Sequence, residues 1–236
     1  MHYCGIVPVQ RQLQLAVLEE VRAPEPPIRL SAIFFEPGSA AQVSEELRSL
    51  GDVVVGVGAP LSGRQPELER RGVAPQAESP EAARLVELLG LPLFTPDEHA
   101  HAEGPVPEGT YQDFPVFETN ADGVFCALQG RRLPAKRHPY GMQLRIEELL
   151  GDRVTDEGGD LWHRRIEELD AVACALSAHR YAVGHASWLG DPSEGVVVLP
   201  GSGLPETFRS SGVLPPVERL QLPPERAQPR GGEQQH

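Results

Sequence analysis

The chain is poor in basic residues and contains almost no lysine. It has 21 Lys and Arg against 34 Asp and Glu in 236 residues, which gives a net charge of −13. Such an excess of acid argues against loose, charge-driven binding to nucleic acid or to an anionic membrane, although a local basic groove is still allowed. Lys136 is the one lysine, and every other basic residue is arginine.

Long apolar runs and cysteine patterns are also missing. The continuous apolar run around residues 53–57 is far too short to span a bilayer. The first residues carry neither a basic start nor an apolar signal core, and Cys4, Cys126 and Cys174 are too far apart for a disulfide framework or a zinc knuckle. We therefore expect a cytoplasmic protein with no membrane partner.

The composition that remains is that of a globular protein with many turns. Apolar residues make up 40% and charged residues 23%, and there are 24 glycines and 24 prolines. Glycine and proline dominate from residue 201 onward. We expect one domain over residues 1–200 and a Pro/Gly-rich extension over residues 201–236, disordered from about residue 223.

Hydrophobic periodicity favours an α/β fold. Apolar runs at residues 2–7, 13–18 and 29–35 are separated by short connections and predict antiparallel strands. Ser39 predicts the start of a helix that ends at Gly51, and the β-branched run at residues 52–57 predicts a strand covered on both faces. Further strands are expected at residues 116–119 and 195–200, and helices at residues 79–89, 122–128, 140–150 and 161–183.

Carboxylates at the ends of these elements are the first candidates for chemistry. Glu118 follows a short buried strand, and Glu167 and Asp170 share one face of the longest helix, with Glu168 beside them. Converging carboxylates would form a hard oxygen site for Mg²⁺ or Mn²⁺, of the kind that cuts phosphodiesters. The structural alternative is that Glu118 is an ordinary solvated glutamate at a strand end.

Basic residues are concentrated in one short segment. Arg131, Arg132, Lys136, Arg137 and Arg145 lie there. They suggest a patch that meets the phosphates of a nucleic acid, and the alternative is a solvated loop followed by a helix start.

Seven pieces of the chain, in order, resemble a known family. The pieces are residues 4–7 (CGIV), 55–61 (VGVGAPL), 67–73 (ELERRGV), 116–120 (VFETN), 136–141 (KRHPYG) with Arg145, 168–175 (ELDAVACA) and 194–200 (EGVVVLP). They resemble the family numbered 429 among domains of unknown function, which comprises predicted nucleases of the ribonuclease-H-like fold. The resemblance implies a mixed five-stranded sheet with helices on both faces. It also implies a two-metal site using Mg or Mn, with Glu118 and Asp170 as ligands supported by Glu167 or Glu168.

Two positions depart from the family pattern. Val7 and Gly58 stand where the family usually has aspartates, and the resemblance implies that the two residues lie on neighbouring strands near the strands' carboxyl ends. Because metal affinity depends on the number and charge of the ligands, we expect a degenerate site with weak or no phosphodiesterase activity. One alternative is a non-catalytic relative that binds nucleic acid or protein. Another is a small-molecule phosphate enzyme using the Gly56–Gly63 loop, although this loop lacks the lysine of a P-loop and Pro60 has no amide to offer.

Overall fold

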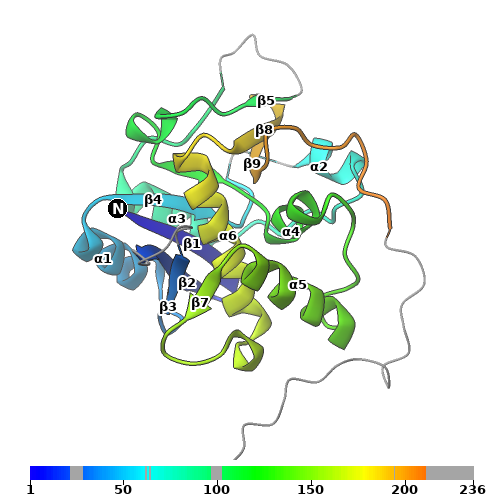
Figure 1. Ribbon diagram of the computed structural model, residues 1–236. Helices are drawn as coiled ribbons and strands as arrows, with labels where there is room; N and C mark the ends of the chain where they lie inside the picture. The colour runs from blue at the N-terminus through cyan, green and yellow to red at the C-terminus, as the bar shows by residue number, and fades with distance from the viewer. Residues whose placement is uncertain (22–28, 62, 64, 97–102, 194, 211–236) are drawn as a thin grey trace, which may run out of the picture.

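The computed structural model describes residues 1–236 except 22–28, 62, 64, 97–102, 194 and 211–236 (Figure 1). The expected disorder from about residue 223 lies outside these described residues. None of the described helices is long and apolar enough to cross a membrane.

A six-stranded mixed sheet forms the centre of the molecule, in the order β6-β4-β1-β2-β3-β7. Its strands are β1 (His2–Val9), β2 (Gln12–Val21), β3 (Arg29–Phe34), β4 (Val53–Val57), β6 (Val116–Glu118) and β7 (Val154–Asp156). Strands β1, β2 and β3 are antiparallel neighbours, whereas β4 runs parallel to β1 and β6 runs parallel to β4. The antiparallel start and the buried fourth strand are confirmed, but the expected count of five strands is wrong. Strand β7 pairs with β3 at the edge, and its three residues are too few to show a strand period in the sequence.

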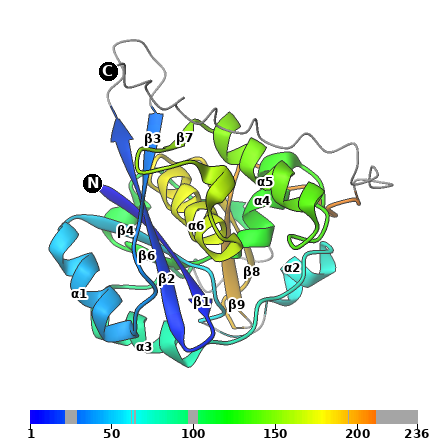
Figure 2. The same ribbon diagram turned by 90° about the horizontal axis from the view of Figure 1, so that it is seen from below.

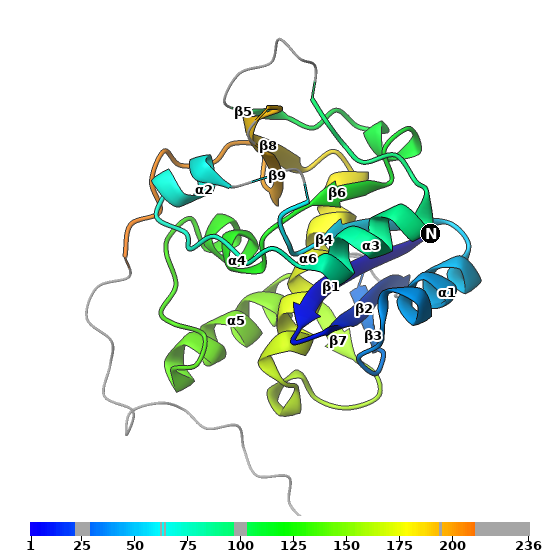
Figure 3. The ribbon, with the colours of Figure 1, turned by 180° about the vertical axis from the view of Figure 1, so that it is seen from behind.

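Helices cover both faces of this sheet, as expected (Figure 2). One face carries α1 (Ala40–Leu50) and α3 (Pro80–Leu89), and the other carries α4 (Ala121–Gln129), α5 (Pro139–Gly151) and α6 (Ile166–Ala182). Figure 3 shows α1 and α3 in front of the strands when the molecule is seen from behind. Side chains of β1 alternate accordingly: Cys4 and Ile6 join the core under α1 and α3, whereas Tyr3 and Val7 join the core that includes α6.

Local sequence signals account for most helix ends. Ser39 forms a capping box with Gln42 at the start of α1, and Ser79 accepts a hydrogen bond from the amide of Ala82 at the start of α3. The longest helix, however, begins at Ile166 and not at residue 161. Asp160 caps a separate 3₁₀ turn, η2 (Leu161–His163), and extended residues follow it before α6 begins.

A second, three-stranded sheet lies beside the first. It consists of β5 (Glu103–Pro105), β8 (Ala186–Asp191) and β9 (Gly195–Pro200), in the order β5-β8-β9. Two short elements complete the fold, α2 (Pro66–Arg70) and η1 (Thr110–Gln112). The chain after residue 200 also packs on this body, because Phe208 is 2% exposed within the core and its amide donates to the carbonyl of Arg71. Residues 201–210 are therefore part of the folded structure.

Candidate functional site

Val7 and Gly58, the two positions without the expected acid, lie side by side at the carboxyl ends of β1 and β4. The amide of Gly58 donates to the carbonyl of Ile6 at 2.7 Å, which continues the parallel pairing of the two strands. Both residues line a hollow of about 270 Å³ together with residues of α6 and of the loop before α5. We call this hollow the site cavity; its charged lining residues are Lys136, Arg137, Glu167 and Asp170. The neighbouring positions expected for residues 7 and 58 are thus confirmed.

Lys136 forms an ion pair with Asp170 inside this cavity. The Lys136 Nζ lies 2.5 Å from the Asp170 Oδ2, and Asp170 itself is 5% exposed. Burial raises the pKa of Asp170 to about 6, against the opposing effect of the lysine charge. Burial works to lower the pKa of Lys136, but Asp170 and Asp122 outweigh this effect and the net direction is upward. The ammonium group therefore stays charged and is held against the carboxylate.

The second oxygen of Asp170 has no partner of its own. Asp170 Oδ1 is buried and makes no hydrogen bond within the part of the chain that the structure describes. A buried carboxylate oxygen without a partner is unfavourable, because its lost hydration is not replaced. The site cavity thus combines one ion-paired oxygen and one unpartnered oxygen on a single aspartate.

Glu118, the other expected ligand, lies on the opposite side of the sheet from α6. In β6 its neighbour Phe117 joins the core that contains α6, so Glu118 points the other way. Its register partner Val57 belongs to the core under α1 and α3, in agreement with this direction. The carboxylate accepts hydrogen bonds from the amide of Leu61 and from Gln65 Nε2, both at 2.7 Å. The structure does not place Glu118 in the site cavity with Asp170.

The two glutamates of α6 have different surroundings. Glu167 is partly exposed and lines the site cavity beside Asp170. Glu168 accepts from the amide of Arg165 at 2.8 Å and forms ion pairs with Arg164 and Arg165. It closes the first turn of α6, where a negative charge also meets the positive end of the helix dipole. Both glutamates lie in the first turn of α6, but of the two it is Glu168 that caps the helix and Glu167 that lines the site cavity.

The residues present do not fit a two-metal centre. Among the described residues, no three His, Cys, Asp or Glu side chains are grouped so as to hold a metal ion. Valine and glycine offer no ligand at positions 7 and 58, and the ammonium group of Lys136 already occupies the face of Asp170 Oδ2. A hard divalent cation needs several oxygen ligands, and here Asp170 and Glu167 are the acidic residues of the cavity.

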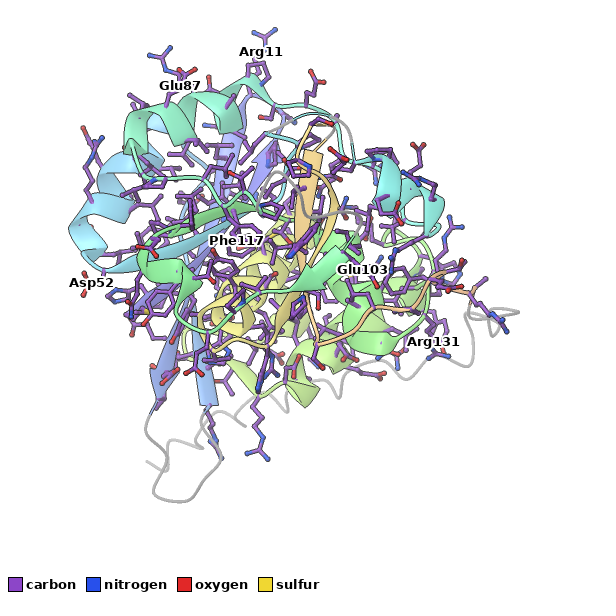
Figure 4. The ribbon with its side chains drawn as sticks, turned by 90° about the horizontal axis from the view of Figure 1, so that it is seen from above. Arg11, Asp52, Glu87, Glu103, Phe117 and Arg131 are labelled. Atoms are coloured by element: carbon purple, nitrogen blue, oxygen red, sulfur yellow. The ribbon has the colours of Figure 1, made fainter. Side chains whose placement is uncertain are left out.

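The five basic residues do not form one continuous surface patch. Arg131, Arg132 and Arg137 are exposed, and Figure 4 shows Arg131 at the periphery of the molecule. Arg145 is instead 3% exposed. It donates to the carbonyls of Pro134 and Gly141 and forms an ion pair with Asp122 at 2.7 Å. Arg145 therefore holds the loop before α5 and is not part of the exposed basic surface.

The Gly56–Gly63 loop is arranged around a carboxylate. The amide of Gly58 donates to the carbonyl of Ile6, and the amide of Leu61 donates to the carboxylate of Glu118. A phosphate placed beside the described residues of this loop would meet the negative charge of Glu118, and the amides of Gly58 and Leu61 are already engaged. The geometry gives the small-molecule phosphate enzyme no support.

The pairing of Lys136 with Asp170 is what sequence reasoning missed. The two residues are 34 positions apart, and Lys136 was counted only among the phosphate-binding candidates. A weak signal existed, since the chain uses arginine at all its other basic positions. Lysine carries a compact charge on a flexible stem, and its ammonium group reaches the buried carboxylate of Asp170.

One comparison with known proteins, the match to a family model, agrees with the resemblance seen in the sequence. Residues 97–194 match the model of the family described as "Protein of unknown function (DUF429)". No curated protein matches the chain. Among solved structures, the Thermus thermophilus RuvC structure is similar, with 16% sequence identity and a TM-score of 0.38. That match covers 75% of this chain and 91% of the other. The resemblance to the DUF429 family is thus confirmed over residues 97–194.

Proposed function

We propose that this relative of the DUF429 family is a degenerate nuclease of the ribonuclease-H-like fold. In this proposal it binds nucleic-acid phosphates at the sheet edge but does not hydrolyse phosphodiesters by a two-metal mechanism. The order of the strands supports the fold assignment: a three-stranded antiparallel unit is followed by parallel strands β4 and β6 on one side. The carboxyl ends of β1, β4 and β6 then meet at one edge.

The ion pair between Lys136 and Asp170 is the observation that carries the proposal. The Lys136 ammonium nitrogen lies 2.5 Å from Asp170 Oδ2, whereas Asp170 Oδ1 has no hydrogen-bond partner among the described residues. A divalent cation at Asp170 would have to displace this ammonium or bear its repulsion at close range. The missing acids at positions 7 and 58 leave no compensating charge, so Asp170 and Glu167 are remnants of a site and not a working one.

The basic residues supply the retained role. Arg131, Arg132 and Arg137 are exposed near the cavity-forming loop, and guanidinium groups bind phosphate through paired hydrogen bonds. Because the whole chain carries a net charge of −13, this binding is expected to be local, weak and sensitive to salt.

Calorimetric titration of Mn²⁺ tests the loss of the metal site. We expect no measurable binding to the natural chain and no cleavage of a labelled single or double strand. The double variant Val7→Asp, Lys136→Gln restores one acid and removes the competing ammonium, so it should bind Mn²⁺ measurably. The matched control is Gln12→Asp, Lys136→Gln, which removes the same lysine but adds the acid at an exposed position outside the cavity.

Two results would contradict the proposal. Tight Mn²⁺ binding with cleavage by the natural chain would show that other ligands complete the site. Absence of any salt-sensitive binding to a labelled single strand, measured by fluorescence anisotropy, would remove the nucleic-acid role and favour a protein-binding relative.

A further inference from the structure

A second cavity adjoins the site cavity and belongs to a different part of the fold. Its volume is about 380 Å³, and it lies between the segment after α2, helix α4 and the loop before α5. We call it the loop cavity. Lys136 and Arg137 line both cavities, so the two hollows share one wall.

The charge of the loop cavity is opposite to that of the whole protein. Four basic residues and one acidic residue line it, in a chain whose net charge is −13. Two of the basic residues are already engaged, Arg145 with Asp122 and Lys136 with Asp170. The side chains of Arg132 and Arg137 have no hydrogen bond or ion pair within the part of the chain that the structure describes, and both are exposed at the rim. Two guanidinium groups are therefore free to receive an anion.

The loop that carries these arginines is held at two points. Arg145 is 3% exposed and donates to the carbonyl of Pro134, which ties the middle of the loop to α5. At the second point the amide of Arg132 donates to the carbonyl of Arg209 at 2.9 Å. A positively charged rim fixed in this way loses less conformational freedom when an anion binds.

The remaining walls are mainly apolar. Val73, Cys126 and Leu133 are buried and line the hollow beneath the charged rim. A cavity of about 380 Å³ is in the range of small-molecule pockets, which span roughly 300–1,000 Å³ and bind an apolar body with a few placed polar groups. The loop cavity thus fits a small organic anion: the rim takes the charged group and the apolar walls take the rest.

We propose that the loop cavity is a binding site for a phosphate monoester. A phosphate group offers three acceptor oxygens to two guanidinium groups, more than a carboxylate can offer, and arginine binds it in a bidentate manner. Asp122 also lines the cavity, where its negative charge disfavours a second phosphate group and its carboxylate can accept a hydrogen bond from a ligand hydroxyl. The ligand class is therefore a monophosphate with a hydroxyl-bearing body, such as a nucleoside monophosphate. This inference does not depend on the loss of metal-dependent cleavage, but it rests on Arg132 and Arg137, which the proposed function assigns to phosphate binding.

Titration of the natural chain with thymidine 5′-monophosphate, thymidine and inorganic phosphate tests the site. We expect binding of the monophosphate, weaker binding of inorganic phosphate, and none of thymidine. Arg132→Gln and Arg137→Gln should each weaken monophosphate binding by about tenfold, as expected for the loss of a charge-assisted contact. The control is Arg84→Gln, an exposed arginine on α3 at the other face of the sheet. Figure 4 shows Glu87 of the same helix pointing outward from the molecule.

A second pair of probes shows whether the phosphate belongs to a free small molecule or to the end of a nucleic-acid strand. Short thymidine strands with a 5′-phosphate and with a 5′-hydroxyl are compared with the free monophosphate. If the phosphorylated strand binds no more tightly than the monophosphate, the natural ligand is a free small molecule. If it binds much more tightly and the 5′-hydroxyl strand does not, the cavity captures strand ends. Both results support a phosphate monoester site.

Two results would overturn the proposal. One is the absence of monophosphate binding to the natural chain. The other is monophosphate binding that Arg132→Gln and Arg137→Gln leave unchanged, while the melting curves show both variants to be folded.

Discussion

Gly5 of β1 lies directly against the backbone of Ala171 in α6. A Cβ atom added to Gly5 would be 1.9 Å from the Ala171 carbonyl oxygen and 2.2 Å from the Ala175 amide nitrogen. On the neighbouring strand, a Cβ atom at Gly56 would be 2.7 Å from the carbonyl oxygen of Cys174. Helix α6 therefore packs closely on the sheet, because the strands contribute glycines to the contact and the helix contributes small residues. This close contact fixes Asp170, the residue before Ala171, beside Val7.

The substitution Gly5→Ala should be among the most destabilising in the chain. The added methyl group meets backbone atoms of α6, which cannot move aside as a side chain can, so the helix would have to shift. We expect a loss of at least about 3 kcal/mol in the free energy of unfolding, measured by urea denaturation. Gly151→Ala is the matched control, because no atom lies within 4 Å of its added Cβ and its φ is not positive. A loss below about 1 kcal/mol for Gly5→Ala would contradict the close packing.

The substitution Lys136→Met should reduce stability in a pH-dependent way. Burial raises the pKa of Asp170 from 3.8 to about 6, so the folded protein holds this proton more tightly than the unfolded chain. Stability therefore falls as the pH rises from about 4 to about 6. Without Lys136 the pKa of folded Asp170 rises further, and the fall continues above pH 6.

The natural chain and Lys136→Met should thus be equally stable near pH 5 and differ at pH 8. We expect a difference of about 2 kcal/mol at pH 8, less than for a fully buried pair because the lysine side chain is 35% exposed. Denaturation at several pH values measures it, with Lys136→Arg as the variant that keeps the charge. A difference that is constant with pH would show that the lysine acts by packing alone.

A larger residue at position 58 is disfavoured by the neighbours of Gly58 and not by its backbone angle. Its φ is not positive, but an added Cβ would lie 2.8 Å from both Cys174 Sγ and Val7 Cγ1. We expect Gly58→Ala to cost about 2 kcal/mol in the natural chain. In a Val7→Ala, Cys174→Ala background the cost should fall by at least about 1 kcal/mol, which a thermodynamic cycle of the variants measures. Equal costs in both backgrounds would locate the strain elsewhere.

Phe208 anchors the segment after β9 to the domain. Truncation to alanine removes a side chain that is 2% exposed in the core, so we expect Phe208→Ala to lower the free energy of unfolding by about 3 kcal/mol. Phe208→Leu should lose much less, and Thr207→Ala, at an exposed position, should have no effect. If Phe208→Ala were neutral, residues 201–210 would contribute nothing to stability and the domain would end near residue 200.

The sequence predicted the elements whose signals are local. The capped helix after Ser39, the helix after Ser79 and the buried strand β4 follow from caps, helical periodicity and a β-branched run, and all three are present. The placement of Val7 beside Gly58 followed from the family resemblance, and the parallel pairing of β1 and β4 produces it. Strands β5 and β7 have three residues each and, unlike the equally short β6 with Val116 and Phe117, contain no apolar run. Their pairing depends on partners far along the chain.

Only the tertiary structure decided which charges meet. The alternation of β6 turns Glu118 away from α6, although its position in the sequence gave no sign of the face it would take. The buried Asp170 pairs with Lys136, which lies 34 residues earlier in the loop before α5. Asp170 reaches this position because the glycines of β1 and β4 let α6 pack closely on the sheet. The sequence, set beside the family pattern, determined that two acids were missing, since that required only residue identities at matched positions. What stands in their place depends on contacts between distant segments, which local propensity and periodicity do not encode.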